Sequence, residues 1–92
     1  TGKLALGPST LYGWDGSTFK KWNINTTNWS AVADTDVTPG GFDTTAGVIV
    51  KDDNTLIALD TTAGNVVEID TTSAAVTVKF ALPVGYTWTP LF

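Results

Sequence analysis

The side chains that could do chemistry are nine acidic residues, five lysines and an aromatic set of four Trp, two Tyr and four Phe. The 92-residue chain has no His and no Cys. It therefore cannot form a Ser–His or Cys–His nucleophile pair, or a zinc site of the usual His/Cys kind. The side chain that most often transfers protons near neutral pH is also missing. The composition predicts a protein that is not an enzyme.

Two acidic clusters, Asp34-Thr35-Asp36 and Asp52-Asp53-Asn54, could offer oxygen ligands to calcium. Neither has the full spacing of a calcium loop, and Asp and Asn are ordinary turn residues. A glycosidase would need a pair of carboxyl groups, one with a raised pKa. Nothing in the sequence marks any Asp for that role. We therefore predict no catalytic residue, no metal site and no cofactor.

The charge balance restricts the partners. The formal net charge is −4 and every basic residue is a lysine, which argues against a surface that follows a phosphate backbone. The chain lacks the run of about 18 apolar residues that a transmembrane helix needs, and no signal-peptide pattern opens it. We predict no nucleic-acid partner and no membrane association. With 42% hydrophobic residues, residues 1–92 can bury the core of a single small domain.

The elements that must position these side chains are strands. Thr, Val, Ile and aromatic residues form short runs separated by Gly, Pro, Asn and Asp, which is typical of an antiparallel all-β protein. The predicted strands are Lys3–Leu6, Thr10–Trp14, Thr18–Asn23, Trp29–Ala33, Gly47–Lys51, Thr55–Asp60, Val66–Asp70, Ala75–Ala81 and Thr87–Phe92.

The chain also contains an internal repeat of about 45 residues. Its aligned segments are Leu4–Leu6 with Val48–Val50, Leu11–Asp15 with Leu56–Asp60, Phe19–Asn23 with Val66–Asp70, and Pro39–Phe42 with Pro83–Tyr86. Each unit, approximately 3–46 and 47–92, then holds four strands. A period of this length with four strands per unit is typical of a β-propeller blade. We predict two such blades.

The first unit resembles one blade of the tachylectin-2-type propeller lectins. The resemblance rests on residues 11–13, 19–21, 28–33, 40–43 and 47–50, which follow the family's order of an L-Y-A strand, an L/F-Y-K strand, an N-W-x-A-x-A strand, a G-G-W-D loop and a hydrophobic strand. The second unit matches more loosely. Separately, Trp14-Asp15-Gly16 resembles the W-D-G turns of phage tail and capsid-decoration proteins.

The lectin resemblance implies a sugar site in which an aromatic ring stacks on the pyranose and polar turn groups bind hydroxyls. The ligand-binding candidates that it implies are Asn28, Trp29, Gly40, Gly41, Phe42 and Asp43 in the first unit, and Gly85, Tyr86 and Trp88 in the second. Phe42 stands where the family has Trp. The alternative for the aromatics Trp14, Trp22 and Trp29 is packing between blades.

Two blades cannot close a ring, which needs at least about four. We therefore expect copies of the chain to complete the propeller, because the free blade faces would otherwise expose apolar surface. The favoured function is a non-catalytic, lectin-like module that assembles as a homo-oligomer and binds glycans outside cells or at a cell surface. The alternative is a phage virion structural protein, a capsid decoration or tail component with no sugar site, whose partners are capsid or tail proteins. The lack of sulfur, the low charge and the missing signal peptide favour that alternative.

Overall fold

The computed structural model describes residues 3–40, 47–85 and 87. These residues form eight strands and no helix, as the all-β prediction required. The first four strands make one antiparallel sheet in chain order: β1 (Lys3–Leu6), β2 (Thr10–Trp14), β3 (Phe19–Asn25) and β4 (Ser30–Ala33). The second four make another in the same order: β5 (Val48–Asp52), β6 (Thr55–Asp60), β7 (Asn65–Asp70) and β8 (Val76–Ala81).

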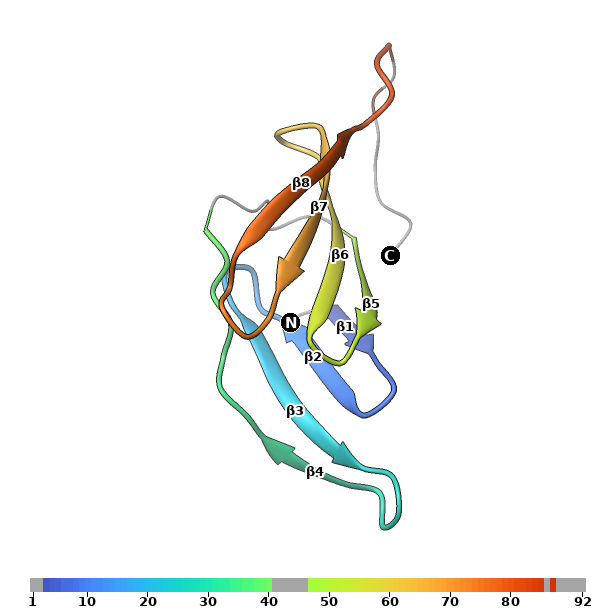
Figure 1. The fold of residues 1–92 in the computed structure, drawn as a ribbon, viewed down its shortest axis with the longest axis vertical. Coiled ribbons are helices and arrows are strands. Elements are labelled where there is room, and N and C mark those ends of the chain that lie inside the picture. Colours follow the sequence, from blue (N-terminus) through green and yellow to red (C-terminus); the bar gives the residue numbers. More distant parts are fainter. Residues whose placement is uncertain (1–2, 41–46, 86, 88–92) are drawn as a thin grey trace.

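The two sheets lie against each other, one below the other in Figure 1. Their first strands, β1 and β5, run close together, whereas the last strands, β4 and β8, lie far apart. Each sheet therefore has one strand near the other sheet and one on the outside of the molecule. The antiparallel order within each sheet is that of a propeller blade.

Local sequence explains where the strands begin and end. Asp15 Oδ1 accepts hydrogen bonds from the amides of Ser17 and Thr18 at 3.0 and 2.9 Å, which turns the chain between β2 and β3. Gly16 in that turn has a φ of 110°, a value that glycine adopts without strain. Between β7 and β8, Asp70 Oδ1 plays the same part by accepting a hydrogen bond from the Thr72 amide at 2.8 Å.

The predicted strands agree with the observed ones to within two residues. Lys3–Leu6, Thr10–Trp14 and Thr55–Asp60 are confirmed at both ends. The largest difference is in β3, which continues to Asn25, two residues beyond the predicted end. Its last pair, Asn25 with Ser30, closes the ladder to β4. The predicted final strand lies outside the described residues except for Thr87, which is not in a strand.

One core joins the sheets. Its buried side chains come from both: Tyr12, Trp14, Phe19, Val37, Leu56, Ala58, Val67 and Ile69. Phe19 is the aromatic centre, because its ring lies 4.3 Å from that of Trp14 and meets Tyr12 edge-on at 6.4 Å. The packing alternative is therefore correct for Trp14.

The two repeat units bury opposite faces. Along β2 the buried residues are Thr10, Tyr12 and Trp14, whereas along β6 they are Leu56, Ala58 and Asp60. Leu56 is the repeat equivalent of Leu11, and its exposed fraction is 0%, while Leu11 stays partly exposed. Because side chains alternate across a strand, the second sheet turns toward the core the face that the first sheet turns away from it. The units pack in the same sense, head to tail.

Candidate functional site

The β3–β4 hairpin ends in a turn that displays Trp29. The indole side chain is 77% exposed, and the turn projects at the lower end of the molecule (Figure 1). The backbone φ of Trp29 is 55°, in the left-handed region that bulky residues rarely occupy. An exposed tryptophan in this conformation contributes little to the core, so Trp29 does not pack between the two sheets of this chain.

Side-chain hydrogen bonds hold the turn around Trp29. Asn25 Oδ1 accepts from the amide of Thr27 at 2.9 Å. Asn28 Oδ1 accepts from the hydroxyl of Ser30 at 2.7 Å and from its amide at 3.2 Å. Such bonds from Asn to nearby backbone stabilise tight turns. They fix the backbone on both sides of Trp29 and direct its ring away from the sheet. We call residues 25–30 the Trp29 turn.

The other predicted site residues do not gather around this turn. Gly40 is exposed beyond the buried pair Val37 and Pro39. Gly85 is exposed with a φ of 89°, in the segment after β8 at the opposite end of the long axis (Figure 1). Of the predicted residues, Asn28 and Trp29 are therefore brought together, whereas Gly40 and Gly85 lie elsewhere. The remaining five, Gly41, Phe42, Asp43, Tyr86 and Trp88, lie outside the described residues.

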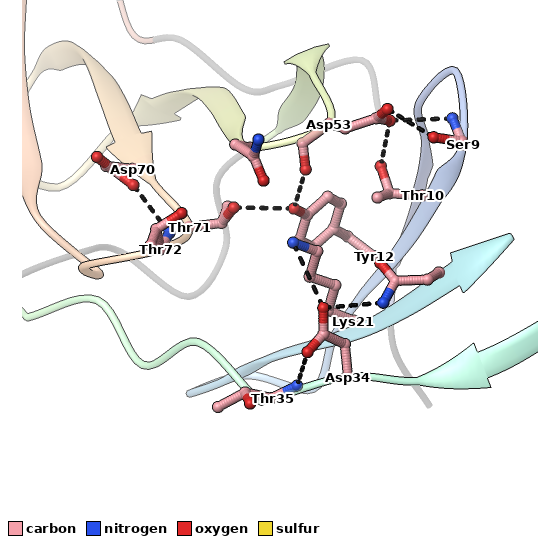
Figure 2. Close-up of polar contacts among 12 residues, drawn as sticks. Ser9, Thr10, Tyr12, Lys21, Asp34, Thr35, Asp53, Asp70, Thr71 and Thr72 are labelled. Atoms are coloured by element: carbon pink, nitrogen blue, oxygen red, sulfur yellow. Dashed lines mark hydrogen bonds and ion pairs between the residues drawn. The ribbon is translucent and has the colours of Figure 1, made fainter.

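A polar groove that the sequence did not predict runs between the two units. It has a volume of about 450 Å³ and lies between the segment after β4 and the β7–β8 turn. Its lining is polar or small: Lys21, Asp34, Thr35, Asp36, Val37, Asn54, Thr71, Thr72, Ser73 and Ala74. Figure 2 shows how the two sheets contribute these groups. The groove exists because the units pack against each other, and neither unit forms it alone.

Asp34 is the carboxylate at the centre of the groove's lower wall. It accepts hydrogen bonds from the Thr35 amide at 2.7 Å and from Asn23 Nδ2 at 3.0 Å, and Lys21 Nζ lies 3.8 Å away (Figure 2). The Thr35 amide above all, followed by Asn23, holds the pKa of Asp34 below its ordinary value of 3.8. The carboxylate is ionised at neutral pH, when it serves as a hydrogen-bond acceptor.

The upper wall of the groove is joined to the first sheet by Tyr12. Its phenol donates to the backbone carbonyl of Asp53 at 2.8 Å and lies 2.9 Å from Oγ1 of the buried Thr71 (Figure 2). The carboxylate of Asp53 reaches back to the β1–β2 turn, where it accepts from the hydroxyl of Ser9 at 2.6 Å and from that of Thr10 at 3.0 Å. These bonds, with Ser9 first, lower the pKa of Asp53.

The acids around the polar groove and in the β5–β6 turn already have hydrogen-bond or ion-pair partners within the chain. Asp36 is paired with Lys20 at 2.7 Å, Asp53 with Ser9 and Thr10, and Asp34 with the groove donors. Across residues 3–40, 47–85 and 87, no cluster of three or more acidic side chains is placed to hold a metal ion. The described part of the chain also offers no apolar helix of membrane-spanning length.

Comparison of the chain with protein-family models, with curated proteins and with solved structures finds no match. Two features stand out: an exposed aromatic ring on a fixed turn, and a polar groove with ionised acceptors. The sequence did single out Asn28 and Trp29, and it drew attention to Asp34 and Asp36 only as turn residues or calcium ligands. Polar turn residues follow both β4 and β7 in the sequence, and this pattern is the signal from which the groove could have been predicted.

Proposed function

We propose that this chain is a non-catalytic glycan-binding module built as two propeller-like blades, with further copies of the chain completing the ring. The observation that carries the glycan site is Trp29, whose ring is 77% exposed on a backbone with a φ of 55°. Holding a bulky residue in that conformation costs about 1–3 kcal/mol. Such strain is commonly stored where a side chain must be presented to a ligand.

The Trp29 turn has the chemistry that a sugar requires. A pyranose offers a C–H face that stacks on an aromatic ring, together with hydroxyls that need hydrogen-bond partners. Asn28 uses its Oδ1 atom to hold Ser30, and its side-chain amide Nδ2 offers two N–H donors. The hydroxyls of Thr26 and Thr27 are exposed beside it. One aromatic face is therefore surrounded by donors and acceptors at the surface.

The acids support binding rather than catalysis. A glycosidase acid must keep its proton near neutral pH, which requires a raised pKa. Asp15, Asp34 and Asp53 have lowered pKa values instead, in each case because hydrogen-bond donors favour the ionised carboxylate. An ionised carboxylate can accept hydrogen bonds from sugar hydroxyls, and Asp34 in the polar groove has lone pairs beyond those used by Thr35 and Asn23.

A glycan array tests the site. We expect the wild-type chain to bind at least one saccharide, and Trp29→Ala to weaken that binding at least about tenfold, as the loss of one stacked ring implies. Trp29→Phe is the matched control, since it keeps an aromatic face and should retain most of the affinity. Absence of binding by the wild type, or unchanged binding by Trp29→Ala, contradicts the proposal.

A second function, a structural subunit of a virion with no sugar site, has one observation in its favour. Both sheets carry apolar side chains on the faces that point away from the core, among them Leu4 at 73% and Leu6 at 70% exposed. Contiguous exposed apolar surface marks a place where proteins associate. Assembly without any glycan binding in the array supports this second function over the first.

A further inference from the structure

The two outward faces of the molecule are repeat equivalents of the two faces that form its core. We define four faces by their central residue. The Tyr12 face (Ala5, Tyr12, Trp14, Phe19 and Lys21) and the Leu56 face (Val48, Val50, Leu56, Ala58, Val67 and Ile69) meet inside the molecule. The Leu11 face lies on the outside of the first sheet and comprises Leu4, Leu6, Leu11, Gly13, Trp22 and Ile24. The Ile57 face lies on the outside of the second sheet and comprises Ile49, Ile57, Leu59, Val66, Glu68 and Phe80.

The equivalence follows from the alignment of the units. Leu4, Leu11 and Trp22 on the free Leu11 face align with Val48, Leu56 and Ile69 on the buried Leu56 face. Ile57, Leu59 and Val66 on the free Ile57 face align with Tyr12, Trp14 and Phe19 on the buried Tyr12 face. The registers of the first two hairpins of each unit agree with this assignment. One complementary pair of faces is thus used within the chain. The second pair has the same pattern and is only partly covered: Val66 on the Ile57 face is buried, whereas Leu4 and Leu6 on the Leu11 face and Ile49 and Phe80 on the Ile57 face are exposed.

We infer that the Leu11 face of one copy packs on the Ile57 face of the next, repeating between chains the contact that joins the two sheets within a chain. This inference rests on the assembly part of the proposed function. The partner on these faces is a second copy of the chain, because the interface between copies would repeat the interface between the two sheets of one chain. Equivalent strands would meet in both interfaces. A head-to-tail contact of this kind is heterologous, and it gives a closed ring where its repeated rotation adds up to a full turn.

The shape of the Leu11 face suits such a contact. A Cβ atom placed on Gly13 would lie 3.4 Å from the ring of Trp22 and 3.6 Å from Leu4 Cδ2. Trp22 and Leu4 therefore flank a position with no side chain, and Gly13 is the equivalent of Ala58, a small residue buried in the internal contact. On the opposing Ile57 face, Ile49 is 50% and Phe80 59% exposed. Apolar side chains are therefore available on both of the faces that would meet.

The contact between copies differs from the internal one in its polar groups. Ile57 replaces Tyr12 and has no hydroxyl, so the hydrogen bonds from Tyr12 to Asp53 and Thr71 have no counterpart. Lys20 stands on the Leu11 face where Val67 stands on the Leu56 face, and its ammonium is paired with Asp36 at 2.7 Å. Its aliphatic stem can cover apolar surface while the charge stays at the rim. We expect a largely apolar association that dissociates on dilution.

Mixing two variants tests the interface. Leu6→Glu disrupts the Leu11 face and Ile57→Glu disrupts the Ile57 face, so each chain keeps one functional face. By native mass spectrometry, we expect an oligomer for the wild type, a monomer for either variant alone, and a 1:1 dimer when the two variants are mixed. Formation of that dimer also shows that both variants are folded. Val32→Glu, at an exposed position on neither outer face, is the control and should assemble like the wild type.

Three outcomes overturn the inference. A wild-type chain that stays monomeric at concentrations of tens of micromolar shows that a second copy does not cover these faces. A variant that still assembles alone shows that its face is not used. A mixture that yields no heterodimer shows that the faces do not pair with each other. None of these results determines the outcome of the glycan array, because Trp29 is on neither outer face.

Discussion

The phenol of Tyr12, in the first repeat unit, donates a hydrogen bond at 2.8 Å to the backbone carbonyl of Asp53, in the second. The same phenol also donates toward Oγ1 of Thr71, 2.9 Å away, so that its single proton is shared between these two acceptors. One side chain thus joins the β2 strand to the β5–β6 and β7–β8 turns of the other sheet. It fixes how the two units sit against each other.

Tyr12→Phe should lower the free energy of unfolding by about 1–2 kcal/mol, because it leaves a partly buried carbonyl and a buried hydroxyl without their partner. Thr71→Val should have a smaller effect. In a double-mutant cycle, the free energies of unfolding lost by the two single variants should sum to more than the loss in the double variant. The reason is that each single variant already removes the Tyr12–Thr71 hydrogen bond. Urea unfolding at one protein concentration measures this. Strictly additive losses would contradict a direct Tyr12–Thr71 bond.

The Asp53 carboxylate makes the contact between the units sensitive to acid. Its folded pKa lies below the ordinary value of 3.8, chiefly because the Ser9 hydroxyl donates to it. A lowered pKa stabilises the fold fully above pH 3.8, and this contribution is lost as the pH falls through the folded value. The wild type should therefore lose stability below about pH 4. Asp53→Asn should be less stable than the wild type at pH 7, by about 1 kcal/mol, and should show a shallower decline in acid.

The matched control is Asp52→Asn. Asp52 is exposed, and the hydrogen bond that it accepts comes from the Asn54 amide within its own turn. An Asn side chain can accept that bond equally well. The control should keep the acid dependence of the wild type. An Asp53→Asn chain with the same acid slope as the wild type is the outcome that contradicts the role given to Asp53.

Engineered cysteines report on the packing between copies without interference, because the chain has no cysteine of its own. Inside the molecule, β1 lies beside β5. The equivalent contact between copies places Leu6 of one chain near Ile49 of another. We expect a mixture of Leu6→Cys and Ile49→Cys to give a mixed disulfide dimer under mild oxidation. Dimers of Leu6→Cys alone, formed at the same rate, would indicate a symmetric contact instead.

Much of the fold could be predicted from the sequence because its determinants are local. Alternating apolar residues and the turn residues Asp15-Gly16 and Asp70 fixed the strands to within two positions. The repeat predicted two sheets of four strands, and both are present. What could not be predicted is which face of each sheet is buried. Leu11 and Tyr12 are both apolar enough for a core, and alternation alone does not choose between them.

The candidate site was predicted only in part, for a similar reason. Asn28 and Trp29 are neighbours in the sequence, so their proximity required no tertiary information. The left-handed backbone of Trp29 could not be anticipated, because bulky residues disfavour it and the bonds that hold the turn, from Asn25 to Thr27 and from Asn28 to Ser30, are seen only in the structure. The polar groove joins Asp34 to Thr71 across the two units, and only the packing of the sheets brings them together.

The function of the Trp29 turn is tested most directly by Trp29→Gly, measured for both stability and glycan binding. Glycine adopts a φ of 55° without strain, although it loses about 0.5–1 kcal/mol through its greater freedom when unfolded. Relief of about 1–3 kcal/mol of strain offsets this. We predict that the free energy of unfolding stays equal or rises by about 1 kcal/mol, while glycan affinity falls at least about tenfold. A Trp29→Gly chain that binds glycans as the wild type does, or that loses stability, contradicts the proposal.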